Sequence, residues 1–134
     1  MTAKWRILIA DDHDLVREAL LQLFDGHPQF EVVAIAVDGE EAVDRASAVN
    51  PDIAVVDMSM PRCSGIEATR RIVALCPDTK VIAFSRERSP RVVKTLLACG
   101  ASGYVLKQSG SGELERALCA VAAGTSHIDP RVSL

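Results

Sequence analysis

Short apolar runs alternate with stretches of helical spacing along the whole sequence, and this alternation constrains the fold more than any other feature. The runs have the length and composition of buried strands and cover residues 7–10, 32–35, 53–56, 81–84 and 104–106. Because such runs offer apolar side chains to both faces, they are typical of a parallel sheet that is covered on both sides.

Each run is followed by a segment with signals for the start and end of a helix. Asp38 with Glu41, and Ser64 with Glu67, have the spacing of capping boxes. Ser89 precedes a proline that suits a first helical turn. Strand–helix units repeated five times predict an α/β fold, with a doubly wound, five-stranded parallel sheet and helices on both of its faces.

Charge and composition argue against several classes of function. The 134 residues fit one domain, and a net charge of −3 argues against a free-standing nucleic-acid binder. No apolar run reaches the ~20 residues of a membrane helix, and the N-terminal run is too short for a signal peptide. We therefore expect a cytoplasmic protein with no membrane partner. The cysteines lack CxxC spacing, and Cys99 and Cys119, in apolar helical patterns, are predicted to be buried, reduced thiols.

Polar side chains follow four of the five predicted strands. Asp11 and Asp12 follow the first strand, Asp57 the third, Ser85 the fourth and Lys107 the fifth. Ligands of open parallel sheets bind outside the carboxyl ends of the strands, so we expect these side chains to meet in one crevice. Each residue alone has a simpler explanation as a helix-capping acid, a turn residue or a surface charge. The simultaneous placement at four strand ends favours a common chemistry.

The chemistry that fits this set is phosphoryl transfer with a divalent cation. Crowded carboxylates repel each other, so their pKa values must rise or a cation must offset the charge. Mg²⁺ prefers oxygen ligands, binds few carboxylates and keeps several waters. A neighbouring lysine would help to neutralise the oxygens of a phosphoryl group. A carboxylate can itself accept that group as an acyl phosphate.

The ordered motifs resemble those of the receiver domains of bacterial response regulators. The matching motifs are the acidic pair 11–12, the loop 57–65 with its aspartate, Met-Pro and glycine, the hydroxyl of Ser85, and the strand-five motif 103–107 with an aromatic residue and a lysine. They cover residues 6 to about 124. His13 after the acidic pair, the following Leu-Val-Arg and the segment 100–104 are similar to the NarL/FixJ subfamily. The resemblance implies a flavodoxin-like (βα)5 fold with strand order 2-1-3-4-5.

The resemblance also implies a role for each residue of the crevice. Asp57 is expected to accept a phosphoryl group from the phosphohistidine of a sensor histidine kinase. Mg²⁺ is expected to be bound by Asp12, Asp57 and the backbone carbonyl of Ser59, with Asp11 acting through a metal-bound water. Lys107 is expected to pair with the phosphoryl oxygens. We expect no enzymatic turnover beyond the domain's own phosphorylation and dephosphorylation.

Ser85 and Tyr104 are expected to form the conformational switch. Phosphorylation adds about 1.5–2 negative charges and new acceptor oxygens at the crevice. Ser85 is expected to move toward one of these oxygens, and Tyr104 to turn inward in step. The face made by strand four, helix four, strand five and helix five would then change, as coupling between sites requires.

The subfamily resemblance sets the expected domain organisation. Residues 1–124 are predicted to form the receiver domain, and residues 125–134 the start of an interdomain linker. In the NarL/FixJ subfamily a LuxR-type helix-turn-helix domain follows, and it lies outside this sequence. We expect a homodimer on phosphorylation and DNA contact only through that C-terminal domain. A stand-alone receiver remains an alternative.

Two residues depart from the simple pattern. Arg86 follows Ser85 where the family usually has a small residue, so it is predicted to affect the lifetime of the phosphoryl group; a plain solvated loop is the alternative. His13 could suggest a metal ligand, but Mg²⁺ prefers oxygen, which favours a surface histidine at a helix start.

Three other functions fit the sequence pattern less well than a receiver domain. A flavodoxin-like cofactor enzyme would need a phosphate-cradling loop after the first strand, where Asp11 and Asp12 would repel an anion. An aspartyl-phosphate phosphatase would need a second acid two residues after the nucleophile, and Ser59 lies there. An atypical receiver that signals without phosphate conflicts with the full set of acidic, hydroxyl and lysine side chains, although Arg86 keeps it open.

Overall fold

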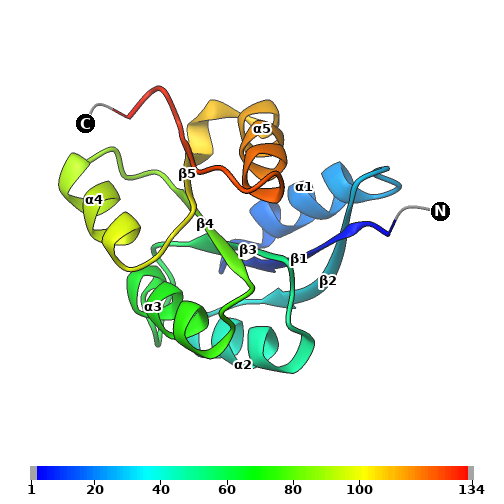
Figure 1. Cartoon of the computed structure of the whole chain (residues 1–134), viewed down its shortest axis with the longest axis horizontal. Helices are drawn as coiled ribbons and strands as arrows, with labels where there is room; N and C mark the ends of the chain where they lie inside the picture. The colour runs from blue at the N-terminus through cyan, green and yellow to red at the C-terminus, as the bar shows by residue number, and fades with distance from the viewer. Residues whose placement is uncertain (1–2, 133–134) are drawn as a thin grey trace.

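The computed structural model describes residues 3–132, and six strands, five α-helices and one short 3₁₀ helix alternate along them (Figure 1). The strands are β1 (Trp5–Ala10), β2 (Phe30–Ala36), β3 (Ile53–Asp57), β4 (Lys80–Ser85), β5 (Gly103–Leu106) and β6 (His127–Ile128). The helices are α1 (Asp14–Phe24), α2 (Gly39–Val49), α3 (Gly65–Leu75), α4 (Pro90–Ala98), η1 (Lys107–Ser109) and α5 (Ser111–Ala122).

The strands form a single parallel sheet in the order β2-β1-β3-β4-β5-β6. Strands β1 to β5 contain the five predicted apolar runs and take the predicted order 2-1-3-4-5, which confirms the doubly wound, flavodoxin-like fold. Strand β6 is an addition to that prediction. It comes from the segment assigned to the linker and pairs with the outer edge of β5.

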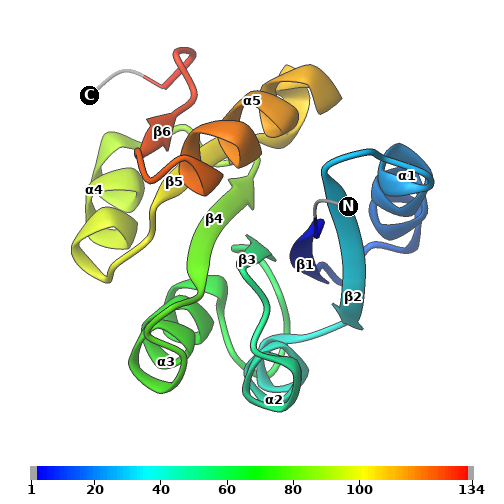
Figure 2. The same ribbon diagram turned by 45° about the vertical axis from the view of Figure 1, so that its right-hand side comes forward.

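Helices cover both faces of the sheet, as Figure 2 shows. On one face, α1 and α5 pack on β1, β3, β4 and β5 through a cluster that includes Phe24, Ile9 and Leu118. On the other face, α2 and α3 enclose a second cluster, and α4 packs on β4 and β5 through a third. Burial on both faces explains why the central strands are apolar throughout.

Local signals in the sequence set several helix ends. The Asp38 carboxylate accepts a hydrogen bond from the Glu41 amide at 2.8 Å, and the Ser64 hydroxyl accepts one from the Glu67 amide at 3.3 Å. The N-cap bond of each predicted capping box is thus confirmed. Ser89 is the N-cap of α4, although its side chain makes no capping bond.

The prediction of buried thiols was wrong for Cys119 and only partly right for Cys99. All four cysteines are free, but Cys119 is exposed and Cys99 is partly buried, whereas Cys63 and Cys76 are buried. Cys119 follows the inward-facing Leu118 on α5, and one residue turns a helix by about 100° toward its outer surface. An apolar helical pattern does not by itself place each of its members in the core.

Candidate functional site

The carboxyl ends of β1, β3, β4 and β5 meet at one edge of the sheet and bring the predicted polar residues together. Asp57 is the last residue of β3, and Ser85 is the last residue of β4. Asp11 directly follows β1, and Lys107 directly follows β5. The predicted convergence at one crevice is therefore what the parallel order of adjacent strands produces.

Asp57 lies at the centre of this crevice and is almost fully buried. Its Oδ1 accepts a hydrogen bond from the Ser59 amide at 3.2 Å, while Oδ2 has no hydrogen-bond partner within residues 3–132. Burial, followed by repulsion from Asp11, raises the pKa of Asp57. The Ser59 amide and Lys107 lower this pKa without cancelling the rise. The folded domain thus holds a carboxylate that is short of positive partners.

Lys107 supplies the positive charge in the crevice. Its Nζ lies 2.8 Å from Asp11 Oδ2 and 3.3 Å from Asp57 Oδ1, and its side chain is 9% exposed. The same ammonium lies 5.8 Å from the centroid of the Phe84 ring, within the range of a cation–π contact. One ammonium between two buried carboxylates leaves a net negative charge.

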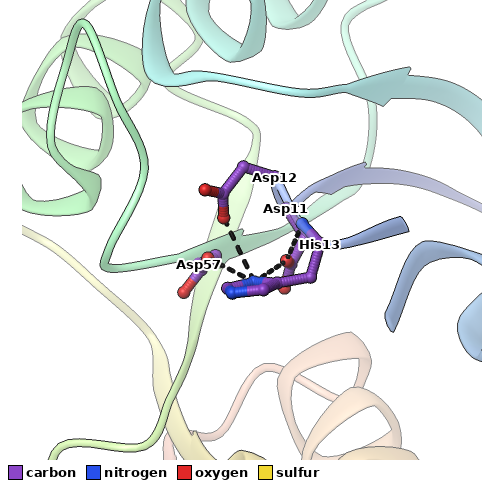
Figure 3. Close-up of side chains that lie close together, drawn as sticks. All are labelled: Asp11, Asp12, His13 and Asp57. Atoms are coloured by element: carbon purple, nitrogen blue, oxygen red, sulfur yellow. Dashed lines mark hydrogen bonds and ion pairs between the residues drawn. The ribbon is translucent and has the colours of Figure 1, made fainter. Parts of the chain in front are cut away.

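Asp12 and His13 complete the acidic cluster (Figure 3). The Asp12 side chain is about one-third exposed, and its Oδ1 lies 3.1 Å from His13 Nδ1. That ring nitrogen also lies 2.9 Å from Asp11 Oδ1 and 3.8 Å from Asp57 Oδ2. His13 is the N-cap of α1 and half exposed, as expected of a histidine at a helix start. Its imidazole nevertheless faces the carboxylates, which the sequence reasoning missed.

Ser85 and Tyr104 lie behind the crevice and connect to the loop that follows β4. The buried Ser85 hydroxyl accepts a hydrogen bond from the Glu87 amide at 3.0 Å. Tyr104 is fully buried, and its hydroxyl donates to the Glu87 carbonyl at 2.5 Å. Burial raises the pKa of Tyr104. Both predicted switch residues therefore contact one backbone unit, that of Glu87, which no sequence signal indicated.

The donors of the crevice fit a hard divalent cation. Ligand atoms of Asp11, Asp12, His13 and Asp57 all lie within 4.8 Å of one another. In the described part of the chain Asp57 Oδ2 has no hydrogen-bond partner, while Asp11 Oδ2 lies 2.8 Å from the Lys107 ammonium. Buried carboxylate oxygens that lack donors are the groups that a cation such as Mg²⁺ would satisfy.

An apolar groove of about 550 Å³ opens beside the crevice between α1 and α5. Its walls include Leu15 and Leu114, and its mouth includes Arg86, Lys107 and Gln108. The Leu15 side chain is 79% exposed. The groove places Arg86 near Lys107 but at the solvent surface, so this arginine borders the crevice without entering the buried acidic cluster.

The fold and the crevice define a doubly wound α/β domain. An acidic cluster and a lysine lie at the carboxyl ends of its parallel strands. Residues 7–119 match the response regulator receiver domain family. The chain is 41% identical over 130 residues to the transcriptional regulatory protein DegU of Brevibacillus brevis, and 36% identical over 128 residues to the response regulator GacA of Pseudomonas viridiflava. These alignments cover 97% and 96% of this chain.

Solved structures give the same result. A LuxR-family two-component response regulator from Aurantimonas superposes with a TM-score of 0.91 at 35% identity, covering 97% of this chain and 93% of that one. The receiver domain of NarL from Mycobacterium tuberculosis superposes with a TM-score of 0.87 at 31% identity, covering 92% and 99%. The chain belongs to the receiver domains of two-component response regulators, and within them to the NarL/FixJ type.

The chain spans only 55% of the length of the DegU relative and 60% of the GacA relative. Membership of the family therefore does not by itself assign the activity of the complete relatives to this chain. Every helix among residues 3–132 is too short or too polar to span a bilayer.

Proposed function

We propose that this domain accepts a phosphoryl group on Asp57 from the phosphohistidine of a sensor histidine kinase, with Mg²⁺ bound at the acidic cluster. The conformational change that follows phosphorylation would control transcription through a C-terminal helix-turn-helix domain. The observation that carries the proposal is the buried Asp57 carboxylate, which has one oxygen without a donor and an ammonium 3.3 Å from the other. A cytoplasmic location and a homodimer of the phosphorylated form belong to the same proposal.

The chemistry assigned to Asp57 is in-line displacement at phosphorus. A carboxylate oxygen forms the new P–O bond while the P–N bond of the phosphohistidine breaks, and the imidazole keeps the electron pair of that bond. Lys107 would pair with the oxygens of the transferred group, because it already lies between Asp11 and Asp57. A cation held by Asp12, Asp57 and the Ser59 carbonyl, with Asp11 acting through a water, would neutralise charge on the same oxygens.

The switch follows from new acceptors at the crevice. The Ser85 hydroxyl accepts a hydrogen bond from the Glu87 amide, and the proton of the same hydroxyl would be donated to a phosphoryl oxygen. Tyr104 donates to the Glu87 carbonyl, so movement of this loop would change the surroundings of the buried ring. The loop leads into α4, so a shift of the loop would change the face made by β4, α4, β5 and α5, as a phosphorylation switch requires.

Treatment with acetyl phosphate tests this function. The wild-type domain is expected to give a shifted band on a phosphate-affinity gel with Mg²⁺ and none after chelation, while Asp57→Asn gives no band. A band that persists in Asp57→Asn would move the acceptor to another residue. If the folded wild type gives no band at all, the phosphate-independent alternative replaces the proposal.

Arg86 is expected to prolong the life of the phosphoryl group. Arg86 is exposed and lines the same groove as Lys107, so its guanidinium is expected to reach phosphoryl oxygens and hinder water. Because an exposed ion pair is worth at most about 1 kcal/mol, Arg86→Ala should shorten the half-life by no more than about fivefold. The half-life is read from loss of the shifted band after acetyl phosphate is removed. Arg91→Ala on the exposed side of α4 is the control, and equal half-lives in all three proteins would show that Arg86 points to solvent.

A further inference from the structure

The C-terminal segment 125–132 is a folded part of the domain. His127 and Ile128 form β6, and the His127 amide donates to the Ser102 carbonyl at 3.1 Å. Val132 is buried in the cluster that also contains Tyr104 and Leu106. The segment therefore covers the outer edge of β5, the strand that carries Tyr104 and leads to Lys107.

Asp129 ties this segment to both sides of Lys107. Its fully buried carboxylate accepts a hydrogen bond from the Leu106 amide at 3.0 Å and one from the Ser109 hydroxyl at 2.5 Å. Its own amide donates to the Tyr104 carbonyl at 2.8 Å. Burial alone would raise the pKa of Asp129, but the hydrogen bonds lower it overall, so the group is ionised at neutral pH. The buried Asp129 charge thus holds the backbone amide before Lys107 and the side chain of Ser109 after it.

Two further contacts anchor the segment to elements of the switch. The His127 ring lies 2.5 Å from the buried carboxylate of Glu113 on α5, which also pairs with Arg116 at 2.8 Å. Burial would raise the pKa of Glu113, but the bonds from His127 and Arg116 lower it overall. The Arg88 guanidinium donates to the Arg131 carbonyl at 3.3 Å. The segment thus touches β5, α5 and the β4–α4 loop at once.

We propose that Asp129 is a positioning residue for Lys107, and that segment 127–132 thereby reports the phosphorylation state of Asp57 to the chain that follows. The inference rests on the proposed phosphorylation of Asp57. Lys107 lies between Leu106 and Ser109, and the Asp129 carboxylate accepts a hydrogen bond from each of these two residues, so Asp129 helps to set the position from which the Lys107 side chain reaches the crevice. Coupling between two sites is reciprocal. A change in the position of Lys107 should therefore alter the hydrogen bonds of Asp129, and a change at Asp129 should alter the position of Lys107.

Amide hydrogen exchange followed by NMR tests the first half of this coupling in the full chain. Phosphorylation with acetyl phosphate and Mg²⁺ is expected to change the exchange rates of the His127 and Asp129 amides by at least about fivefold. The Asp52 region at the opposite end of the sheet serves as the internal reference, since its side chain accepts the Arg6 amide far from the crevice. A purely structural tail would show the same exchange before and after phosphorylation.

Phosphorylation rates test the second half. Asp129→Ala and the milder Ser109→Ala are expected to slow phosphorylation by acetyl phosphate, the first by at least about fivefold. Asp52→Ala, which also removes a carboxylate bonded to a backbone amide, should react like the wild type. If Asp129→Ala does not fold, Ser109→Ala decides the matter. Unchanged exchange at His127 and Asp129 together with a wild-type rate in Ser109→Ala would overturn the inference, whereas a wild type that is never phosphorylated would overturn the proposed function itself.

Discussion

Replacing Lys107 with methionine is expected to slow phosphorylation of Asp57 by about 10²–10³-fold, the range found when one preorganised charge donor is removed from a transition state. Methionine keeps a long apolar stem against Phe84 and removes only the ammonium. The rate is measured with acetyl phosphate at saturating Mg²⁺. Lys94→Met, on the exposed side of α4, is the matched control and should leave the rate unchanged.

The same variant should bind Mg²⁺ more tightly than the wild type. Lys107 lies 2.8 Å from Asp11 Oδ2 and 3.3 Å from Asp57 Oδ1, so its removal takes a competing cation away from these two carboxylates. Titration calorimetry of the metal with each protein measures this affinity. Slower phosphorylation with tighter Mg²⁺ binding assigns Lys107 to the phosphoryl group. A rate within about threefold of the wild type would contradict that assignment, since it corresponds to less than about 1 kcal/mol of barrier.

Without bound Mg²⁺, Lys107→Met should have a lower free energy of unfolding than the wild-type domain. Loss of one partner leaves two buried carboxylates facing each other, and removal of one member of a buried ion pair costs about 3–5 kcal/mol. Added Mg²⁺ should recover much of the loss, because a ligand that binds only the folded state stabilises it. Urea unfolding with and without Mg²⁺ is measured for both proteins: if the loss comes from the unpaired carboxylates, the metal should stabilise the variant more than the wild type, whereas a general folding defect would give equal gains.

The sequence predicted the sheet and the crevice because both depend on periodicity. Apolar runs on both faces require cover on both faces, and strand order then brings the residues after β1, β3, β4 and β5 to one edge. Asp57, Ser85 and Lys107 lie where this logic put them. Their burial was not part of the prediction: Asp57 and Ser85 are nearly inaccessible to solvent.

Periodicity could not predict the direction of individual side chains or the extra strand at the edge of the sheet. The position of His13 at a helix start gives its exposure, but the turn of its ring toward Asp12 depends on rotamer and local charge. Strand β6 is two residues long and has no period to detect. Asp129 adds to its pairing with β5 by accepting a hydrogen bond from the Leu106 amide, but an aspartate before a proline is ordinarily interpreted as a turn residue until its burial is known.

The loop after Asp57 adds a case in which a motif residue has a packing explanation. Gly65 opens α3, and its amide donates to the Met58 carbonyl at 3.2 Å. A Cβ at this position would lie 2.4 Å from Met58 Cα and 2.5 Å from the Asp57 carbonyl oxygen. Both atoms belong to the backbone and have no rotamer with which to move aside. The glycine therefore allows the start of α3 to lie against the end of β3.

Gly65→Ala is accordingly expected to destabilise the domain, at the upper end of the about 1–3 kcal/mol typical of overpacking. The forced shift should also slow phosphorylation, because the displaced backbone is that of Asp57 and Met58. Gly112→Ala, at an exposed position of α5, is the matched control. There the added Cβ would meet only the flexible end of Arg116 at 3.8 Å. That change should raise stability by up to about 1 kcal/mol through helix propensity. Urea unfolding of both variants, with the acetyl phosphate rate measured in parallel, gives opposite signs if Gly65 is required for close packing; equal stability changes would instead mean that the α3 start adjusts freely.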